Sequence, residues 1–214
     1  LKFILDGKEG LFDLTKRKIT VKCEYTELEP LYYARRPHSY IALKDGMYGI
    51  LEDNGKIAVP IEYNDIWPSD TFYNVYLGDS EEWRVYEVEQ GGIVDEYDSF
   101  KEESEFGIVE YKSLKGIWSY SYNKLIHPVI YSSVEKVENY YIVGLQTYGF
   151  FRRSLFGVFD IKLNEIIPFR YENITLYNEK YFKYQGSLEE DGIQYCGFGL
   201  FDLNGESVLK PKYQ

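Results

Sequence analysis

The feature that most constrains this chain is a short motif that recurs six times along its 214 residues. The motif consists of a small residue, two apolar residues, and then an acidic or polar residue. Its copies are Gly10-Leu11-Phe12-Asp13, Gly49-Ile50-Leu51-Glu52, the diverged Arg84-Val85-Tyr86-Glu87, Gly116-Ile117-Trp118-Ser119, Gly157-Val158-Phe159-Asp160 and Gly199-Leu200-Phe201-Asp202. A chain of this kind folds as one supersecondary unit repeated in tandem, because each unit can bury its apolar residues only against a neighbour.

A second anchor accompanies the motif. A tyrosine follows each opening residue at the nearly constant distance of 13 to 15 positions, as Tyr25, Tyr63, Tyr97, Tyr131, Tyr171 and Tyr213. Pro60, Pro128 and Pro168 each lie three positions before their tyrosine. Because proline cannot donate a hydrogen bond to a strand ladder, we expect the proline to end the third strand of its copy or to lie at the edge.

Each copy is predicted to form a small antiparallel meander. An alternating segment such as 40–43 precedes the turn at Asp45-Gly46, the glycine-led strand follows, and Asn54-Gly55 forms the next turn. Such dipeptides supply the positive φ angles that tight hairpins need. The repeated strand glycine predicts a close backbone approach, which we expect from the neighbouring copy.

We therefore predict an all-β protein without a significant helix, in which β-meander or hairpin repeats stack into an open, curved, solenoid-like array. A closed β-propeller-like ring is the alternative, because a repeat spacing near 40 residues also suits a propeller blade. A single repeat domain is predicted over residues 1–214. Its six degenerate repeats span approximately 1–31, 40–70, 74–100, 106–136, 140–176 and 181–214.

The second copy shows the fullest pattern: Tyr48 before Gly49, two apolar residues, an acid, then Asn54-Gly55-Lys56 and a final Pro-x-x-Tyr. This pattern resembles the WG (KWG) repeat found widely in bacterial proteins, and the resemblance covers essentially the whole chain. The literal pair Trp-Gly is absent from every copy; where Trp83 precedes the small position, Arg84 replaces the glycine. The resemblance implies a binding or scaffolding role and carries no shared catalytic residues.

Charge and motif content narrow the function classes. The 24 basic and 35 acidic residues give a formal net charge of −11, which repels a phosphate backbone, so nucleic acid is not an expected partner. The two cysteines, Cys23 and Cys196, are too few for a disulfide framework, and the sequence leaves open whether they are free or bridged. No metal, nucleotide or hydrolase motif accompanies the two histidines. We therefore expect no catalytic residues, no metal site and no cofactor, and hence a protein that is not an enzyme.

The sequence gives little information on the cellular compartment. No apolar run approaches the ~18 residues that a membrane-spanning helix needs. The first residues, Leu1 to Leu5, lack the features of a signal peptide and an initiator methionine, so we expect part of a longer chain. A cytoplasmic and an exported location are equally compatible with this pattern.

The candidate binding residues are aromatic residues outside the core motif: Trp67, Tyr73, Tyr141 and Tyr181. Residues that vary between copies are free to carry specificity, and Tyr and Trp offer a large contact area with a polar tip. The alternative is that these rings pack one copy on the next. The predicted function is a non-enzymatic repeat scaffold for protein–protein interaction, with a carbohydrate or cell-surface glycan-binding module as the alternative.

Overall fold

The computed structural model describes residues 1–31, 38–69, 72–94, 96–103, 106–146, 154–190 and 193–211, and these ranges contain strands and turns but no helix. The predicted anchor Tyr213 lies outside the described residues. The chain divides into two compact units, one formed by residues 1–111 with 116–129 and the other by 112–115 with 130–214. Each unit has its own hydrophobic core.

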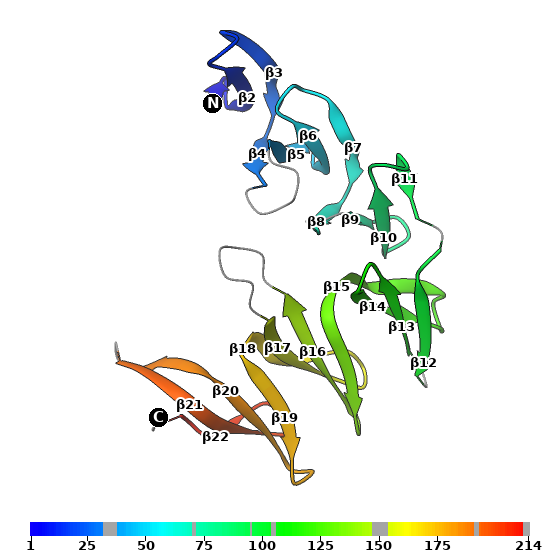
Figure 1. Ribbon diagram of the computed structural model, residues 1–214, viewed down its shortest axis with the longest axis vertical. Helices are drawn as coiled ribbons and strands as arrows, with labels where there is room; N and C mark the ends of the chain where they lie inside the picture. Colours follow the sequence, from blue (N-terminus) through cyan, green and yellow to red (C-terminus); the bar gives the residue numbers. More distant parts are fainter. Residues whose placement is uncertain are drawn as a thin grey trace. The chain divides into compact units, whose positions relative to one another are not determined.

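Strands in the first unit follow one another as antiparallel neighbours (Figure 1). The first sheet contains β1 (Lys2–Leu5), β2 (Lys8–Asp13) and β3 (Lys18–Tyr25). The second contains β4 (Glu27–Pro30), β5 (Ser39–Lys44), β6 (Met47–Glu52) and β7 (Ile57–Tyr63). The third copy forms β8 (Asp65–Pro68), β9 (Tyr73–Leu77), β10 (Glu82–Glu87) and the short β11 (Gly92–Ile93).

The remaining copies continue the same pattern. The fourth forms β12 (Ser99–Glu103), β13 (Phe106–Tyr111), β14 (Leu114–Ser119) and the first half of the long β15 (Lys124–Val137). The fifth forms the second half of β15 with β16 (Tyr140–Gln146), β17 (Ser154–Asp160) and β18 (Glu165–Tyr171). The sixth forms β19 (Asn173–Tyr177), β20 (Tyr181–Glu190), β21 (Ile193–Asp202) and β22 (Ser207–Leu209).

The hairpin turns follow the local chemistry that the motif supplies. Asp45 and Gly46 join β5 to β6 with φ angles of 54° and 82°, the left-handed pair that a two-residue hairpin requires. At the end of the motif, the acid caps the next turn. Asp160 Oδ1 accepts hydrogen bonds from the backbone N–H groups of Lys162 and Asn164, both at 2.8 Å, and Asp202 does the same for Asn204 and Glu206.

The strand glycine and the Pro-x-x-Tyr segment together form a β-bulge between the third and fourth strands of a copy. Tyr48 pairs with Tyr63 and Ile50 with Val59, so that Gly49 alone faces residues 60–62. A Cβ at Gly49 would lie 2.6 Å from the Pro60 carbonyl oxygen, closer than such contacts occur. The same shift in register occurs between β2 and β3 and between β17 and β18. The bulge explains why the glycine and the tyrosine keep their spacing.

The expectation that a neighbouring copy covers this glycine is wrong, because the covering backbone belongs to the same copy. Neighbouring copies meet instead at the turn glycine of Asn-Gly. A Cβ on Gly55 would lie 2.6 Å from the carbonyl oxygen of Thr20 in the preceding copy, and Gly205 lies against Ile166 in the same way. The strand glycine is therefore required by the bulge within its own copy, whereas the turn glycine is required by the contact with the neighbouring copy.

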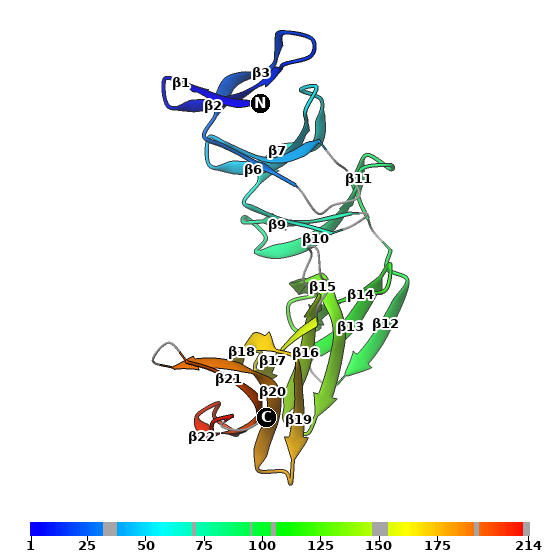
Figure 2. The ribbon, with the colours of Figure 1, turned by 60° about the vertical axis from the view of Figure 1, so that its left-hand side comes forward.

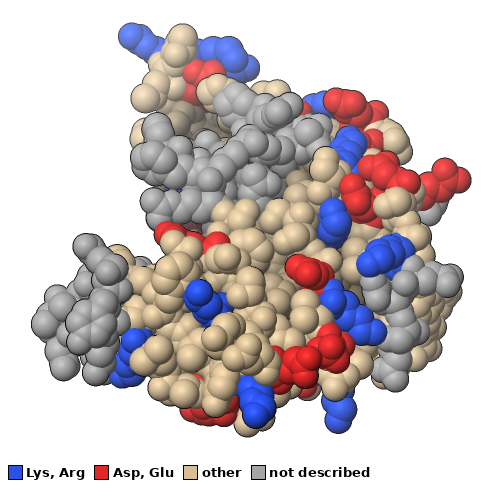
Figure 3. Space-filling model, turned by 60° about the horizontal axis from the view of Figure 1, so that its bottom comes forward, with Lys and Arg blue, Asp and Glu red and all other residues tan. Residues whose placement is uncertain are grey.

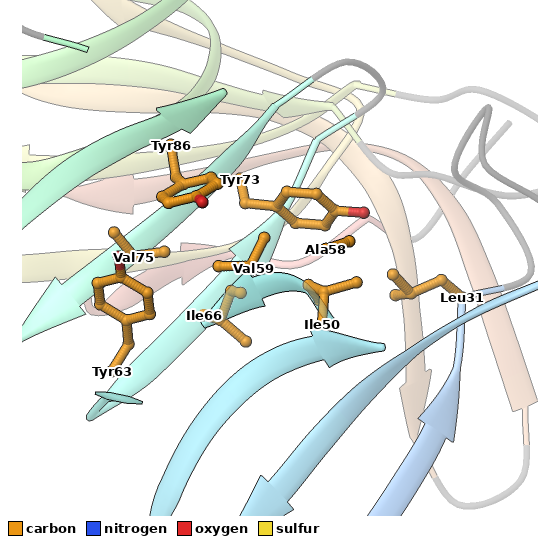
Figure 4. Packing of buried hydrophobic residues seen from close by; sticks show 9 residues of the cluster. All are labelled: Leu31, Ile50, Ala58, Val59, Tyr63, Ile66, Tyr73, Val75 and Tyr86. Carbon is orange, nitrogen blue, oxygen red and sulfur yellow. The ribbon is translucent and has the colours of Figure 1, made fainter. Parts of the chain in front are cut away.

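The cores lie between successive copies. Leu11, Val21, Tyr25, Leu28, Ala42 and Leu51 join copies one and two. Figure 4 shows the next cluster, in which Tyr73 and Val75 of the third copy lie among Ile50, Ala58 and Val59 of the second. In the second unit, Ile142, Val158, Ile167, Tyr171, Ile174, Phe182, Tyr184 and Phe201 join copies five and six. Stacking of copies therefore supplies the burial that a single meander lacks.

The predicted all-β class and the tandem meander repeats are confirmed, and the sheets that the structure describes are open, without closure into a barrel. Most copies have four strands instead of the predicted three, because a short extra strand follows the anchor tyrosine, as β4 follows Tyr25. The expectation that proline ends a strand is wrong, because Pro60 and Pro168 lie within β7 and β18, at the bulge. The choice between an open array and a closed ring stays a prediction. Within the described ranges, no helix is long and apolar enough to cross a membrane.

Candidate functional site: an aromatic groove in the third copy

The third copy departs from the others where Arg84 replaces the strand glycine. In the second copy the fourth strand bulges towards Gly49, where a Cβ would clash, and Arg84 stands at the corresponding position of the third copy. The fourth strand, β11, contains only two residues and pairs Tyr86 with Ile93 and Glu87 with Gly92. One further backbone bond, from Val94 N–H to Val85 O at 2.8 Å, completes the contact. The beginning of β10 therefore pairs with β9 of its own copy but not with β11, and the β9–β10 hairpin can be followed in Figure 2.

The fourth copy pairs with this part of β10 on the edge opposite β9. Trp83 pairs with Leu125 at the beginning of β15, in antiparallel register. Asn74 of β9 reinforces the junction: its side-chain amide donates to Val129 O at 3.1 Å and accepts from Val129 N–H at 2.7 Å. Asn74 is fully buried, so both hydrogen bonds are shielded from water.

A groove of about 590 Å³ lies beside this junction, lined by Asp65, Tyr76, Glu81, Trp83, Tyr122, Lys124 and Ile126. Its volume falls within the roughly 300–1,000 Å³ typical of small-ligand sites. The rings of Tyr76 and Trp83 form its aromatic wall, tilted by 49° with their centroids 5.2 Å apart. Tyr122 stands on the turn between β14 and β15 with 73% of its surface exposed. The groove thus offers ring faces that no other part of the third copy covers completely.

Charged side chains frame the rings. The Lys124 ammonium lies 5.6 Å from the Tyr122 ring centroid, 3.7 Å from Glu81 Oε2, and donates a hydrogen bond to Ser80 O at 3.0 Å. Asp65 is exposed and accepts the backbone N–H of Ile66 at 2.7 Å through one oxygen. Two carboxylates and one ammonium leave the groove with an excess of one negative charge.

His127 follows Ile126 in β15 and adds no positive charge at neutral pH. Burial lowers the pKa of its imidazole to about 4. Among the described residues, no group of three or more His, Cys, Asp or Glu side chains is arranged to hold a metal ion. Cys23 and Cys196 are free thiols. On the face shown in Figure 3, acidic and basic side chains are mixed.

The four aromatic residues predicted to bind a partner do not form one surface. Trp67 is exposed at 41% and pairs with Asn74 across β8 and β9, but it does not line the groove. Tyr181 begins β20 in the second unit and is half-buried. Tyr73 and Tyr141 are each only 1% exposed and lie in the interior. For these two residues the structure fits the alternative interpretation, packing between copies.

The interior residues share one position in the repeat. Tyr73 pairs with Tyr86, Tyr141 with Phe159, and Phe182 with Phe201, in each case two residues beyond the opening residue of the motif. The hairpin between second and third strands differs in length from copy to copy, and this difference hides the equivalence in the sequence. A residue at this position is recognised as part of the core by the motif residue with which it pairs, and not by its distance along the chain.

The sequence prediction missed Tyr76, Trp83 and Tyr122, although one signal pointed to them. Trp83 was recognised as the residue before the small position, and Arg84 as the departure from glycine. A departure from the repeat at a position that requires glycine predicts a local break in the sheet. Tyr122, on a turn between two motif strands, carries no comparable signal.

The fold defines the chain as a tandem β-meander repeat protein with an aromatic surface groove in its third copy. Residues 156–185 match the model of the family described as WG containing repeat, which confirms the predicted resemblance at the fifth copy. The matched segment runs from β17 through β19 into β20, so the family unit begins within one sheet and ends within the next.

A search of curated proteins found no match. Solved structures with some likeness include KlHsv2 with loop 6CD replaced by a Gly-Ser linker (11% identity, TM-score 0.31), the tricorn protease (10%, 0.31) and a eukaryotic initiation factor (11%, 0.30). The likeness covers 85%, 97% and 97% of this chain, and 64%, 27% and 72% of those chains. The chain thus spans less than two thirds of the first of these structures. Likeness at such TM-scores carries no argument about function.

Proposed function

We propose that this protein is a non-enzymatic repeat scaffold that binds a protein partner through the aromatic groove of its third copy. The observation that carries the proposal is the break in the repeat at Arg84. In the second copy the motif strand pairs with its own fourth strand from Tyr48 onward, whereas here that pairing is confined to the end of β10, and Trp83, Tyr76 and Tyr122 line a groove beside the junction with the fourth copy.

The composition of the groove supports a macromolecular partner. Trp and Tyr are the residues most enriched at the centres of protein interfaces, because they bury a large area and lose little conformational entropy. The groove also carries carboxylates and an ammonium at its rim, where charged side chains steer the encounter and set the orientation of a partner.

Site-specific photo-crosslinking tests the proposal. Tyr122 is replaced by a benzophenone-bearing amino acid, and the chain is irradiated in extract of the source cell. We expect a crosslinked protein whose yield falls when excess unlabelled wild-type chain is added. Tyr177, which is 48% exposed in the second unit, is the matched control position and should give no such product.

Competition with a groove variant decides the outcome. An unlabelled chain carrying Trp83→Ala should compete poorly, provided that its circular dichroism spectrum matches the wild type. If this variant competes as well as the wild type, the partner binds elsewhere and the groove is not its site.

A glycan is the second candidate, favoured by one feature of the groove. An exposed Tyr and a half-buried Trp and Tyr beside carboxylates resemble the combination that stacks against a sugar ring and accepts hydrogen bonds from its hydroxyl groups. A glycan array probed with the wild-type chain and with Trp83→Ala tests this candidate. Binding of a defined glycan that Trp83→Ala abolishes would favour it over a protein partner.

A further inference from the structure

Lys124 occupies the part of the groove best suited to a cation. Its ammonium lies over the ring of Tyr122, beside a carboxylate of Glu81, and against the carbonyl oxygen of Ser80. A positive charge over an aromatic face is attracted by the negative face of the ring, and the carboxylate adds a direct charge attraction. The chain thus fills a cation site with a side chain of its own.

A second lysine in the same unit makes similar contacts in a closed setting. Lys44 lies 5.7 Å from the Tyr25 ring centroid and 3.0 Å from Glu24 Oε2. Tyr25 is only 5% exposed, so its ring belongs to the core between copies one and two. Tyr122 is 73% exposed and belongs to no core cluster among the described residues. The two sites share their chemistry, but only the one at Lys124 opens onto a groove.

The charge balance favours an incoming cation over an anion. The groove contains Asp65 and Glu81 against Lys124, and the chain carries a net charge of −11. A guanidinium suits the remaining features better than an ammonium does, because it is planar, stacks on aromatic faces, and can bind a carboxylate through two parallel N–H groups.

We propose that the groove recognises an arginine side chain within an extended basic segment of the partner, and that Lys124 holds the guanidinium position when the partner is absent. This inference rests on the proposed function, of which it names the partner chemistry. The partner's arginine displaces the Lys124 ammonium from Tyr122 and Glu81, stacks between Tyr122 and Trp83, and pairs with the released carboxylate.

Titration with short fluorescent peptides tests the inference on the full chain at fixed salt. The probes are nine-residue peptides of alternating arginine and serine, lysine and serine, or glutamate and serine. The wild type should bind the arginine peptide most tightly and the glutamate peptide least. Lys124→Met removes the competing ammonium but keeps most of the side-chain stem, and it should tighten binding of the arginine peptide by roughly two- to fivefold, the range of one exposed cation–π contact. Tyr122→Leu should weaken it by a similar factor.

Lys44→Met is the matched control, since it removes the same charge from the same unit. It should leave the affinity nearly unchanged at physiological ionic strength, where screening limits long-range effects to about 8 Å. Equal effects of Lys124→Met and Lys44→Met, or equal binding of the arginine and lysine peptides, would overturn the inference. Tighter binding of an N-acetylglucosamine hexasaccharide than of the arginine peptide would also overturn it.

Failure of this inference and failure of the proposed function are separable. A protein that crosslinks at Tyr122, together with peptides that show no preference for arginine, leaves the scaffold role standing and removes the arginine site. The absence of any groove-dependent crosslink removes the scaffold role itself, whichever peptide binds.

Discussion

The replacement Gly49→Ala tests the bulge that defines the repeat. The new Cβ would lie 2.6 Å from the Pro60 carbonyl oxygen, 2.7 Å from Cγ1 of Ile61 and 2.8 Å from Cα of Ile61. Two of these three atoms belong to the backbone, so the clash cannot be relieved by rotating a side chain. The fourth strand must move away, and its pairing at Tyr63 and Val59 moves with it.

The magnitude follows from the cost of overpacking, typically 1–3 kcal/mol. Because the obstacle is backbone, we expect the upper end, about 3 kcal/mol. For a chain of 150–250 residues, each kcal/mol lowers Tm by roughly 2–4 °C, so the transition should fall by roughly 6–12 °C. Urea denaturation followed by circular dichroism gives the change in the free energy of unfolding.

Two controls separate the bulge from a general effect of alanine. A Cβ on Gly92 would meet nothing within 4 Å, so Gly92→Ala should be neutral or stabilise by roughly 0.4–1 kcal/mol. Arg84 occupies the same motif position as Gly49 but faces no bulge, so Arg84→Ala should change stability by only about 1 kcal/mol, through loss of its half-buried pair with Glu82. If Gly49→Ala and Gly92→Ala unfold at the same urea concentration, the close backbone contact at the bulge is not the reason that Gly49 must be glycine.

Three further predictions concern buried groups. Asn74→Ala removes the hydrogen-bond partners of both the N–H and the carbonyl group of Val129 and should cost on the order of 2–4 kcal/mol of unfolding free energy. Asn64→Ala removes an exposed hydrogen bond from the Gly78 N–H and should cost less than about 1 kcal/mol in the same urea assay. Tyr73→Ala should cost about 3–5 kcal/mol, while Trp67→Ala should lower Tm only slightly; equal losses would mean that the burial of Tyr73 has been misjudged. Desolvation raises the pKa of Tyr63, Tyr111 and Tyr184 from 10.0 to about 12, so the folded state favours the neutral phenols. The stability that depends on neutral phenols is fully present below pH 10 and is lost as the pH rises towards 12. Urea midpoints measured from pH 7 to 11 should therefore stay level until about pH 10 and then fall, and a fall beginning near pH 8 would contradict this origin.

The repeat could be predicted from the sequence because its spacing has a local physical cause. The strand glycine, the capping acid and the anchor tyrosine act within one hairpin and its bulge, so their distances along the chain are fixed. The extra strand after the anchor tyrosine was missed because it pairs with a strand that lies across a connection of variable length, as β4 pairs with β5 across residues 31–38.

The candidate site was harder to predict for a related reason. Whether an aromatic residue is core or surface depends on its cross-strand partner, and the length of the hairpin that sets this partner varies between copies. Tyr73 and Tyr141 therefore looked like connector residues, although each pairs with a motif residue in the interior. Trp83 looked like a degenerate motif residue, although at that point β10 pairs with the fourth copy instead of with its own fourth strand.

The three tryptophans provide the most direct test of the central claim, that the groove of the third copy is the binding surface. Trp67, Trp83 and Trp118 each give one indole N–H signal in a ¹⁵N-correlated NMR spectrum, and Trp→Phe variants assign them. Trp67 is the exposed residue favoured by the sequence, and Trp118 packs edge-on against Tyr97 and Phe100 of the first unit. On titration with the arginine peptide, or with the protein recovered by crosslinking, the Trp83 signal should shift in proportion to occupancy while the other two stay in place. A shift of the Trp67 or Trp118 signal with Trp83 unmoved would place the binding surface elsewhere and contradict the account.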